Sequence, residues 1–139
     1  MSDPFDLQRF VDAQRDSYDA ALAELRAGDK RSHWMWFVFP QIAGLGRSAT
    51  AQHFAISGLD EACAYLAHPV LGPRLRECAQ ALLDTGSTDA VAVLGSIDAQ
   101  KLRSSMTLFA RADAGEPRFR AVLDRFFDGN EDDATTGRL

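Results

Sequence analysis

Side chains that could bind a ligand gather in one segment, SHWMWFVFPQIAGLGRS, which spans residues 32–48. Two tryptophans, Trp34 and Trp36, stand two positions apart and follow His33. Side chains two positions apart on a helix point about 200° away from each other, so the two indoles would face different surroundings. Tryptophan is rarely buried completely, and its N–H needs a hydrogen-bond partner. Two interpretations stay open: both tryptophans anchor the core, or one of them forms the wall of a cleft on which a ligand ring stacks.

A glycine loop follows the aromatic run. Gly44 and Gly46 flank a leucine, and Arg47 and Ser48 come directly after them. Serine in this position caps a helix, and the backbone N–H groups of a helix start can bind an anion that glycines allow to approach. The chain carries neither GxxxxGK nor GxGxxG. The loop therefore predicts either an ordinary capped turn or an anion site in which Arg47 supplies the positive charge.

A second polar group lies in DAQKLRSSMTLFA, residues 98–110. Asp98 is expected to cap a helix, and Lys101 and Ser105 share a face because they are four positions apart. A serine beside a lysine can be a nucleophile with its base. The order KxxSS, however, reverses the SxxK of penicillin-binding enzymes, and no oxyanion hole is in sight. Ser104 and Ser105 are expected to line a pocket, to face solvent or to pack against a helix.

We expect the two segments to form the walls of one polar pocket in which Arg47 and Lys101 face each other and neutralise an anionic ligand. The ligand would be a small anion with an aromatic ring, such as a nucleotide or an ADP-ribose-like compound, with His33 or Asp98 available for acid–base work. The alternative is a non-enzymatic interaction module or homodimer in which the aromatic segment is core or interface. The candidate ligand-binding residues are His33, Trp34, Trp36, Gln41, Gly44, Gly46, Arg47, Ser48, Asp98, Lys101, Ser104 and Ser105. No cofactor is expected, and no metal, because no Cys or His ligand spacing occurs.

Helices are predicted to position these residues, from caps and apolar spacing. Residues 33–39 are assigned to a short buried helix, because the chain has no second strand-like run with which they could pair. The predicted helices are one from Asp3-Pro4 to Gly28, the short one at 33–39, one capped by Ser48 through Ile56, one over 59–67 opened by a capping box of Ser57 and Asp60, one from Pro69 to Gly86, a short one before Gly95, one capped by Asp98, and one from Glu116-Pro117 to Gly129.

The sequence therefore predicts an all-α fold: a single compact bundle of about seven to eight helices over residues 1–139. Residues 130–139 form a polar, acidic tail. We expect this tail to be mobile unless its threonines dock on the bundle.

Composition limits the partners. The chain has 139 residues and a net charge of −5, which argues against nucleic acid and anionic membranes, since both bind basic faces. The N-terminal sequence lacks a signal-peptide pattern, and no stretch comes near the roughly 18 apolar residues of a membrane span, so a cytoplasmic protein is expected. Cys63 and Cys78 are expected to be buried, reduced thiols. The oligomeric state stays open.

Three long motifs resemble a known family: KRSHWMWFVFPQIAGLGRS at 30–48, AYLAHPVLGPRL at 64–75 and DAQKLRSSMTLFA at 98–110. This is an uncharacterised, mostly bacterial, all-helical family of small stand-alone domains, sometimes labelled calpastatin. The resemblance covers nearly the whole chain. It implies a helical bundle and no particular activity. The chain departs from the family at Phe54, where relatives usually have tyrosine.

Overall fold

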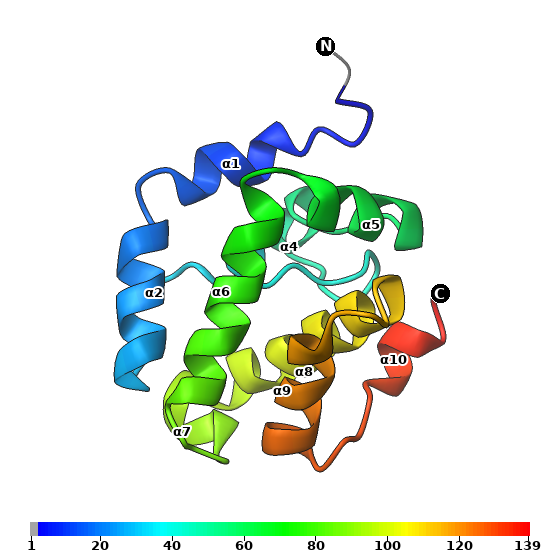
Figure 1. The fold of residues 1–139 in the computed structure, drawn as a ribbon. Coiled ribbons are helices and arrows are strands. Elements are labelled where there is room, and N and C mark those ends of the chain that lie inside the picture. The colour runs from blue at the N-terminus through cyan, green and yellow to red at the C-terminus, as the bar shows by residue number, and fades with distance from the viewer. Residues whose placement is uncertain (1–2) are drawn as a thin grey trace.

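The structure, a computed structural model, describes residues 3–139. Over these residues the chain forms ten α-helices and no β-strand (Figure 1). They are α1 (Gln8–Gln14), α2 (Tyr18–Ala27), α3 (Met35–Val38), α4 (Ala49–His53), α5 (Leu59–Ala67), α6 (Leu71–Asp84), α7 (Ala90–Leu94), α8 (Ser96–Ala112), α9 (Pro117–Phe127) and α10 (Asp133–Thr136). The all-α prediction is confirmed. The helices are more numerous than the expected seven to eight, because one expected helix is two and the tail contains another.

Helix α8 is the centre of the packing, and it contacts α5, α7, α9 and α10. Helix α6 crosses the front of the molecule in Figure 1 and packs against α2, α5 and α9. The apolar stripes expected from the sequence are buried, which confirms the core: Leu71, Leu75, Cys78, Ala79 and Leu82 on α6, and Leu102, Met106 and Phe109 on α8. Cys63 is exposed, so the expectation of a second buried thiol is wrong.

The N-terminal region differs from the single helix expected before Gly28. The chain bends between α1 and α2, where the Ser17 backbone leaves the helical region. At the bend the buried Gln14 amide donates to the Phe37 carbonyl (2.7 Å) and to the Tyr65 hydroxyl (3.2 Å). This bend lets two short helices cover two sides of the core. Gly28 ends α2, as predicted, and its φ of 68° is left-handed.

Several predicted caps are confirmed and others are wrong. Ser48 and Glu116 accept bonds from the N–H groups of Ala51 and Arg118 and cap α4 and α9. The expected capping box of Ser57 and Asp60 does not form, because the Glu61 carboxylate accepts from the Ser57 N–H instead (2.9 Å). Helix α8 begins two residues before Asp98, so Asp98 lies in its first turn and does not cap it.

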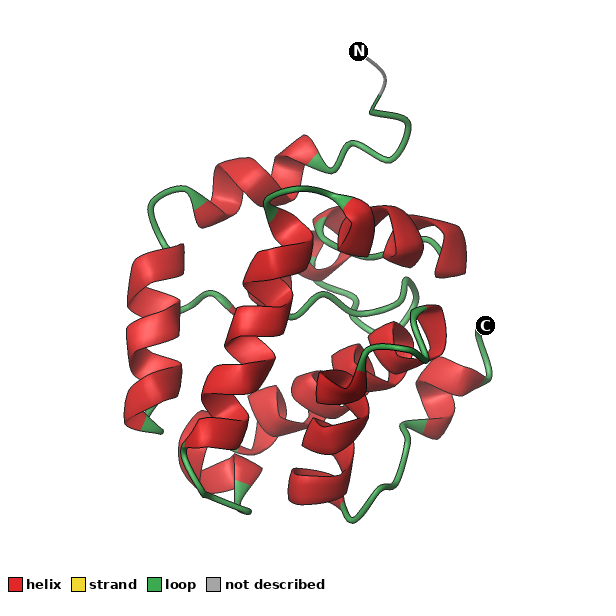
Figure 2. Ribbon diagram, in the orientation of Figure 1, coloured by secondary structure: helices red, strands yellow, loops and turns green. Residues whose placement is uncertain are grey.

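The segment between α2 and α4 is mostly loop, as its green ribbon in Figure 2 shows, and it contains only the short helix α3. An isolated bridge joins Ile42 to Ile56. Met35–Val38 form α3, which confirms the helical interpretation of the run at 33–39 for these residues.

The C-terminal tail is docked on α8 and is not the freely mobile segment that its polar composition suggested. The buried Asp132 carboxylate accepts from the hydroxyls of Ser104 (3.0 Å) and Thr135 (2.6 Å) and from the Gln100 amide (2.9 Å). Its backbone N–H donates to the Thr107 hydroxyl (2.9 Å). The threonine docking that the sequence left open therefore occurs, and it fastens the tail to α8.

Among residues 3–139, no helix is long and apolar enough to span a membrane.

Candidate functional site

A pocket of about 340 Å³ lies between the start of the aromatic segment and the junction of α7 with α8. Its walls come from three places in the sequence: the loop after α2, the segment around α3 and the first turns of α8. The lining residues are Lys30, His33, Met35, Trp36, Leu94, Gly95, Ser96, Ile97, Asp98 and Lys101. Pockets of this size are large enough for a small organic ligand.

The charged groups of this pocket form one linked set. The Lys30 ammonium lies 2.8 Å from one oxygen of Asp98, and the Lys101 ammonium lies 3.6 Å from the other oxygen. Two positive charges share one negative charge, so the set keeps an excess positive charge in a protein whose net charge is −5. The Lys30 side chain is 9% exposed, the Lys101 side chain 21%. Partial burial strengthens their interaction with any anion that enters.

Each lysine also lies against one of the two tryptophans. The Lys101 ammonium is 4.5 Å from the centre of the Trp36 ring, and the Lys30 ammonium is 5.1 Å from that of Trp34. Both distances are in the range of cation–π interactions. Trp36 is half-buried and lines the pocket, whereas Trp34 is 1% exposed and belongs to the core. Of the two interpretations of the tryptophans, the packing therefore favours the second: Trp34 belongs to the core, and Trp36 forms part of a pocket wall.

Glu24, on the last turns of α2, fixes the backbone that carries these aromatic residues. Its carboxylate accepts from the N–H groups of Arg31 (2.7 Å) and Ser32 (2.9 Å), from the Ser32 hydroxyl and from the Trp34 indole N–H (3.0 Å). Burial alone would raise the pKa of Glu24, but these four bonds outweigh it and lower the pKa to about 2. Glu24 therefore stays ionised and holds the loop that leads to His33 and Trp36.

A narrow groove adjoins the pocket and shares Trp36 with it. The groove residues are Trp36, Gln41, Ile42, Gly44, Gly46, Ala51, Phe54 and Ala55, and its free space of about 10 Å³ is no more than a water molecule needs. A Cβ at Gly46 would lie 2.5 Å from the Ala51 Cβ. At Gly44, with φ of 99°, a Cβ would lie 2.6 Å from Nη1 of Arg138. Close packing thus accounts for Gly46 and the positive φ for Gly44, and the glycine loop is a capped turn beside a five-residue helix.

The structure brings together seven of the twelve candidate residues around Trp36. His33, Asp98 and Lys101 line the pocket with it, and Gln41, Gly44 and Gly46 line the groove. Arg47 and Ser48 are exposed and line neither, so the expectation that Arg47 and Lys101 face one pocket is wrong. The cation that accompanies Lys101 is Lys30, which the sequence did not reveal because its partner Asp98 is far away along the chain.

Ser104 and Ser105 of α8 also lie outside the pocket. Ser104 is 1% exposed and is bonded to Asp132, while Ser105 is fully buried, and its hydroxyl has no hydrogen-bond partner among residues 3–139. The pairing of Lys101 with a serine nucleophile therefore has no geometric support. Lys101 instead interacts with Asp98, which lies three positions before it on the same helix. Partners three positions apart share a helix face just as partners four positions apart do.

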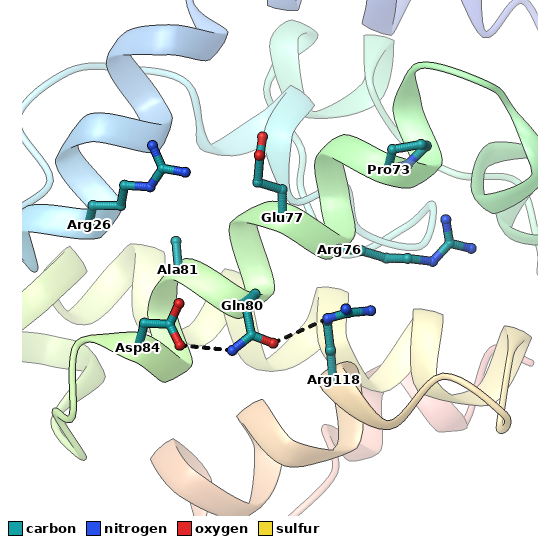
Figure 3. A pocket seen from close by; sticks show the side chains of 8 residues that line it. All are labelled: Arg26, Pro73, Arg76, Glu77, Gln80, Ala81, Asp84 and Arg118. Atoms are coloured by element: carbon teal, nitrogen blue, oxygen red, sulfur yellow. Dashed lines mark hydrogen bonds between the residues drawn. The ribbon is translucent and has the colours of Figure 1, made fainter.

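A second hollow, of about 390 Å³, runs along the exposed face of α6 between α2 and α9 (Figure 3). It carries three arginines, but Arg76 and Arg118 both pair with the nearly buried Glu116, at 3.1 and 2.8 Å. In Figure 3, Arg118 also donates to Gln80, which in turn donates to Asp84. The positive charge of this hollow is neutralised within the protein, which makes it a weaker candidate for an anion than the pocket at Trp36.

No group of three or more His, Cys, Asp or Glu side chains in the described part of the chain could hold a metal ion.

The fold and pocket define a small all-α domain with one lysine-rich hollow beside an aromatic wall. Residues 4–139 match the family described as "Protein of unknown function (DUF1810)", and the chain belongs to that family. This confirms the resemblance seen in the three motifs. The structure is similar to the crystal structure of the conserved hypothetical protein Rv1873 from Mycobacterium tuberculosis, with a TM-score of 0.97 and 50% identity over 99% of this chain and 98% of that chain. Among curated proteins, none matches the chain.

Proposed function

We propose that this protein binds a small anionic, nucleotide-like ligand in the pocket between Trp36 and the start of α8. The observation that carries the proposal is the position of the Lys101 ammonium, 4.5 Å from the Trp36 ring centre, inside a pocket that Lys30 also lines. An aromatic wall and two ammonium groups in one hollow suit a ligand with a flat ring and a negative charge.

Two further features support this ligand class. The first N–H groups of a helix have no intrahelical partners, and those of α8 add partial positive charge at the pocket that Ser96 and Ile97 line. The rest of the lining is largely apolar, from Met35, Leu94 and Ile97. The arrangement supports binding of an anion with an aromatic ring.

The test compares AMP, ADP and ADP-ribose with adenosine, by thermal unfolding and by quenching of tryptophan fluorescence. A ligand that binds only the folded protein raises its unfolding midpoint. We expect the charged compounds to stabilise the wild type, Trp36→Ala to abolish the effect and Trp36→Phe, which keeps a ring, to retain most of it. Arg26→Ala, in the hollow along α6, is the matched control and should behave as wild type. No stabilisation of the wild type by any of these compounds would contradict the proposal.

A second candidate is a non-enzymatic interaction module or homodimer, which exposed apolar side chains next to the pocket favour. Ile97 is 74% exposed and Val91 is 55% exposed. In this version a second copy of the chain would cover them. Light scattering distinguishes the candidates: a dimer that Ile97→Asp converts to monomers would support the module, and a wild-type monomer at all concentrations would contradict it.

A further inference from the structure

We infer that Asp98 sets the charge preference of the pocket: a group with one negative charge, such as a carboxylate or a phosphodiester, binds best, and the Asp98 carboxylate weakens the binding of a group that carries a second negative charge. This inference deepens the proposed function and rests on it. The observation behind it is that the two oxygens of the Asp98 carboxylate have different partners: one lies 2.8 Å from the Lys30 ammonium and the other 3.6 Å from the Lys101 ammonium.

The lysine and aspartate side chains that line the pocket leave an excess of one positive charge. Lys30 and Lys101 are the lysines of the lining, Asp98 is its carboxylate, and no arginine or glutamate contributes. Asp98 therefore acts as an internal anion that neutralises one of the two ammonium groups. A single further negative charge completes the balance, whereas a phosphate monoester, which carries nearly two charges, would meet the Asp98 carboxylate as a neighbour.

Asp98 also has a structural role. The Lys30 side chain is only 9% exposed, and an ammonium group that is nearly buried needs a partner. Without Asp98, Lys30 and Lys101 would repel each other until an anion replaced the carboxylate. Removal of Asp98 should therefore produce a protein that is less stable alone and more responsive to anions of higher charge.

The experiment measures thermal unfolding of wild type, Asp98→Asn and Asp60→Asn with inorganic phosphate or formate, at constant ionic strength and mildly alkaline pH, where phosphate is mainly a dianion. Asp60 is the matched control, because it is an exposed aspartate in the first turn of α5, and its loss changes the net charge and the helix start in the same way. Both probes lack a ring, so the result does not depend on stacking against Trp36.

We expect Asp98→Asn to unfold at a lower temperature than wild type without phosphate and to bind phosphate at least about tenfold more tightly, with little gain for formate. Asp60→Asn should respond as wild type does. Equal phosphate responses of Asp98→Asn and Asp60→Asn would overturn the inference. A wild type that ignores AMP, together with a selective phosphate gain in Asp98→Asn, would contradict the nucleotide-like ligand and support the role of Asp98.

Should Asp98→Asn fail to fold, Lys101→Gln provides the complementary test, because Lys101 is the more exposed lysine. In this variant Lys30 and Asp98 cancel each other, so the excess positive charge is gone. We expect the response to formate and to phosphate to weaken at least about tenfold relative to wild type. An unchanged response in Lys101→Gln would overturn the inference.

Discussion

Trp34 and Trp36 are two positions apart and share the same chemistry, yet the fold uses them differently. Trp34 is 1% exposed, its indole N–H donates to Glu24, and its ring packs at 6.3 Å from the ring of Phe39. Trp36 is half-buried and forms part of the wall of two adjoining hollows. The difference follows from the start of α3 between them: Trp34 precedes the helix with a non-helical backbone, and Trp36 lies within it, so the two side chains point in different directions.

The lysines beside the two tryptophans differ in burial in the same way. Lys30 covers Trp34, is nearly buried and is held at 2.8 Å by Asp98. Lys101 covers Trp36, is more exposed and stands farther from the same carboxylate, at 3.6 Å. The first pair closes the core, and the second pair borders the pocket. Stability should therefore depend mainly on Trp34 and Lys30, and binding on Trp36 and Lys101.

The largest expected effect separates the two indoles. Trp34→Ala removes a buried side chain and leaves Glu24 without one of its donors, so it should cost about 3–5 kcal/mol of unfolding free energy. Trp36→Ala should cost only about 1 kcal/mol, because its ring is half-buried. Urea denaturation of both variants measures the two losses. Equal large losses would make Trp36 a structural residue and remove the aromatic wall from the proposed site.

The next effect concerns Glu24, which holds the segment that carries both tryptophans. Its pKa in the folded protein is about 2, against an ordinary value of 4.5. A lowered folded-state pKa means that the ionised carboxylate stabilises the fold above pH 4.5, and that this contribution is lost as the pH falls toward 2. Glu24→Gln should cost about 1–2 kcal/mol at neutral pH and flatten the acid side of the stability curve.

The measurement is the urea midpoint of wild type and Glu24→Gln between neutral pH and the acid limit. Asp19→Asn is the control, since Asp19 is an exposed acid on the same helix. An acid-side slope that Glu24→Gln leaves as steep as in wild type would show that other carboxylates cause it.

A comparison of the two lysines comes third in size. Lys30→Gln should cost about 1–2 kcal/mol, because the amide replaces a nearly buried ammonium that bonds Asp98. Lys101→Gln should cost less than about 1 kcal/mol. Stability is measured by urea denaturation, and AMP binding by thermal shift. A Lys101→Gln variant that is as unstable as Lys30→Gln would show that both lysines mainly stabilise the fold.

The sequence predicted the helices whose signals are local. Gly28 and Glu116-Pro117 mark helix ends through their own backbone geometry, and the stripes of α6 and α8 follow helical spacing. The sequence did not predict those features of the fold that depend on contacts between residues far apart in the chain. The bend before α2 is bonded through Gln14 to residues of α3 and α5. The tail, whose docking the sequence left open, is held by the bonds of Asp132 to side chains of α8. Helix propensity carries no information about either contact.

The candidate site divides in the same way. His33, Trp36, Asp98 and Lys101 could be chosen from two local motifs, and the structure places them in one pocket. The choice of their second cation was wrong. Arg47 was chosen because it follows a glycine loop, whereas Lys30 begins the motif at 30–48 with no neighbouring feature that marks it as a ligand-binding residue. Only the pairing of Lys30 with Asp98, across the fold, reveals its place in the pocket.

The smallest expected effect concerns Arg47, and it tests this correction directly. Arg47 is exposed, its carbonyl accepts from the Gln52 amide (3.0 Å), and its side chain lines neither hollow beside Trp36. Arg47→Ala should therefore change the unfolding free energy by less than about 0.5 kcal/mol. It should also leave the thermal shift with AMP equal to that of wild type, while Lys101→Gln in the same assay loses it. If Arg47→Ala weakens AMP binding as much as Lys101→Gln does, the glycine loop contributes to the site after all, and the pocket at Trp36 must extend across it to Arg47.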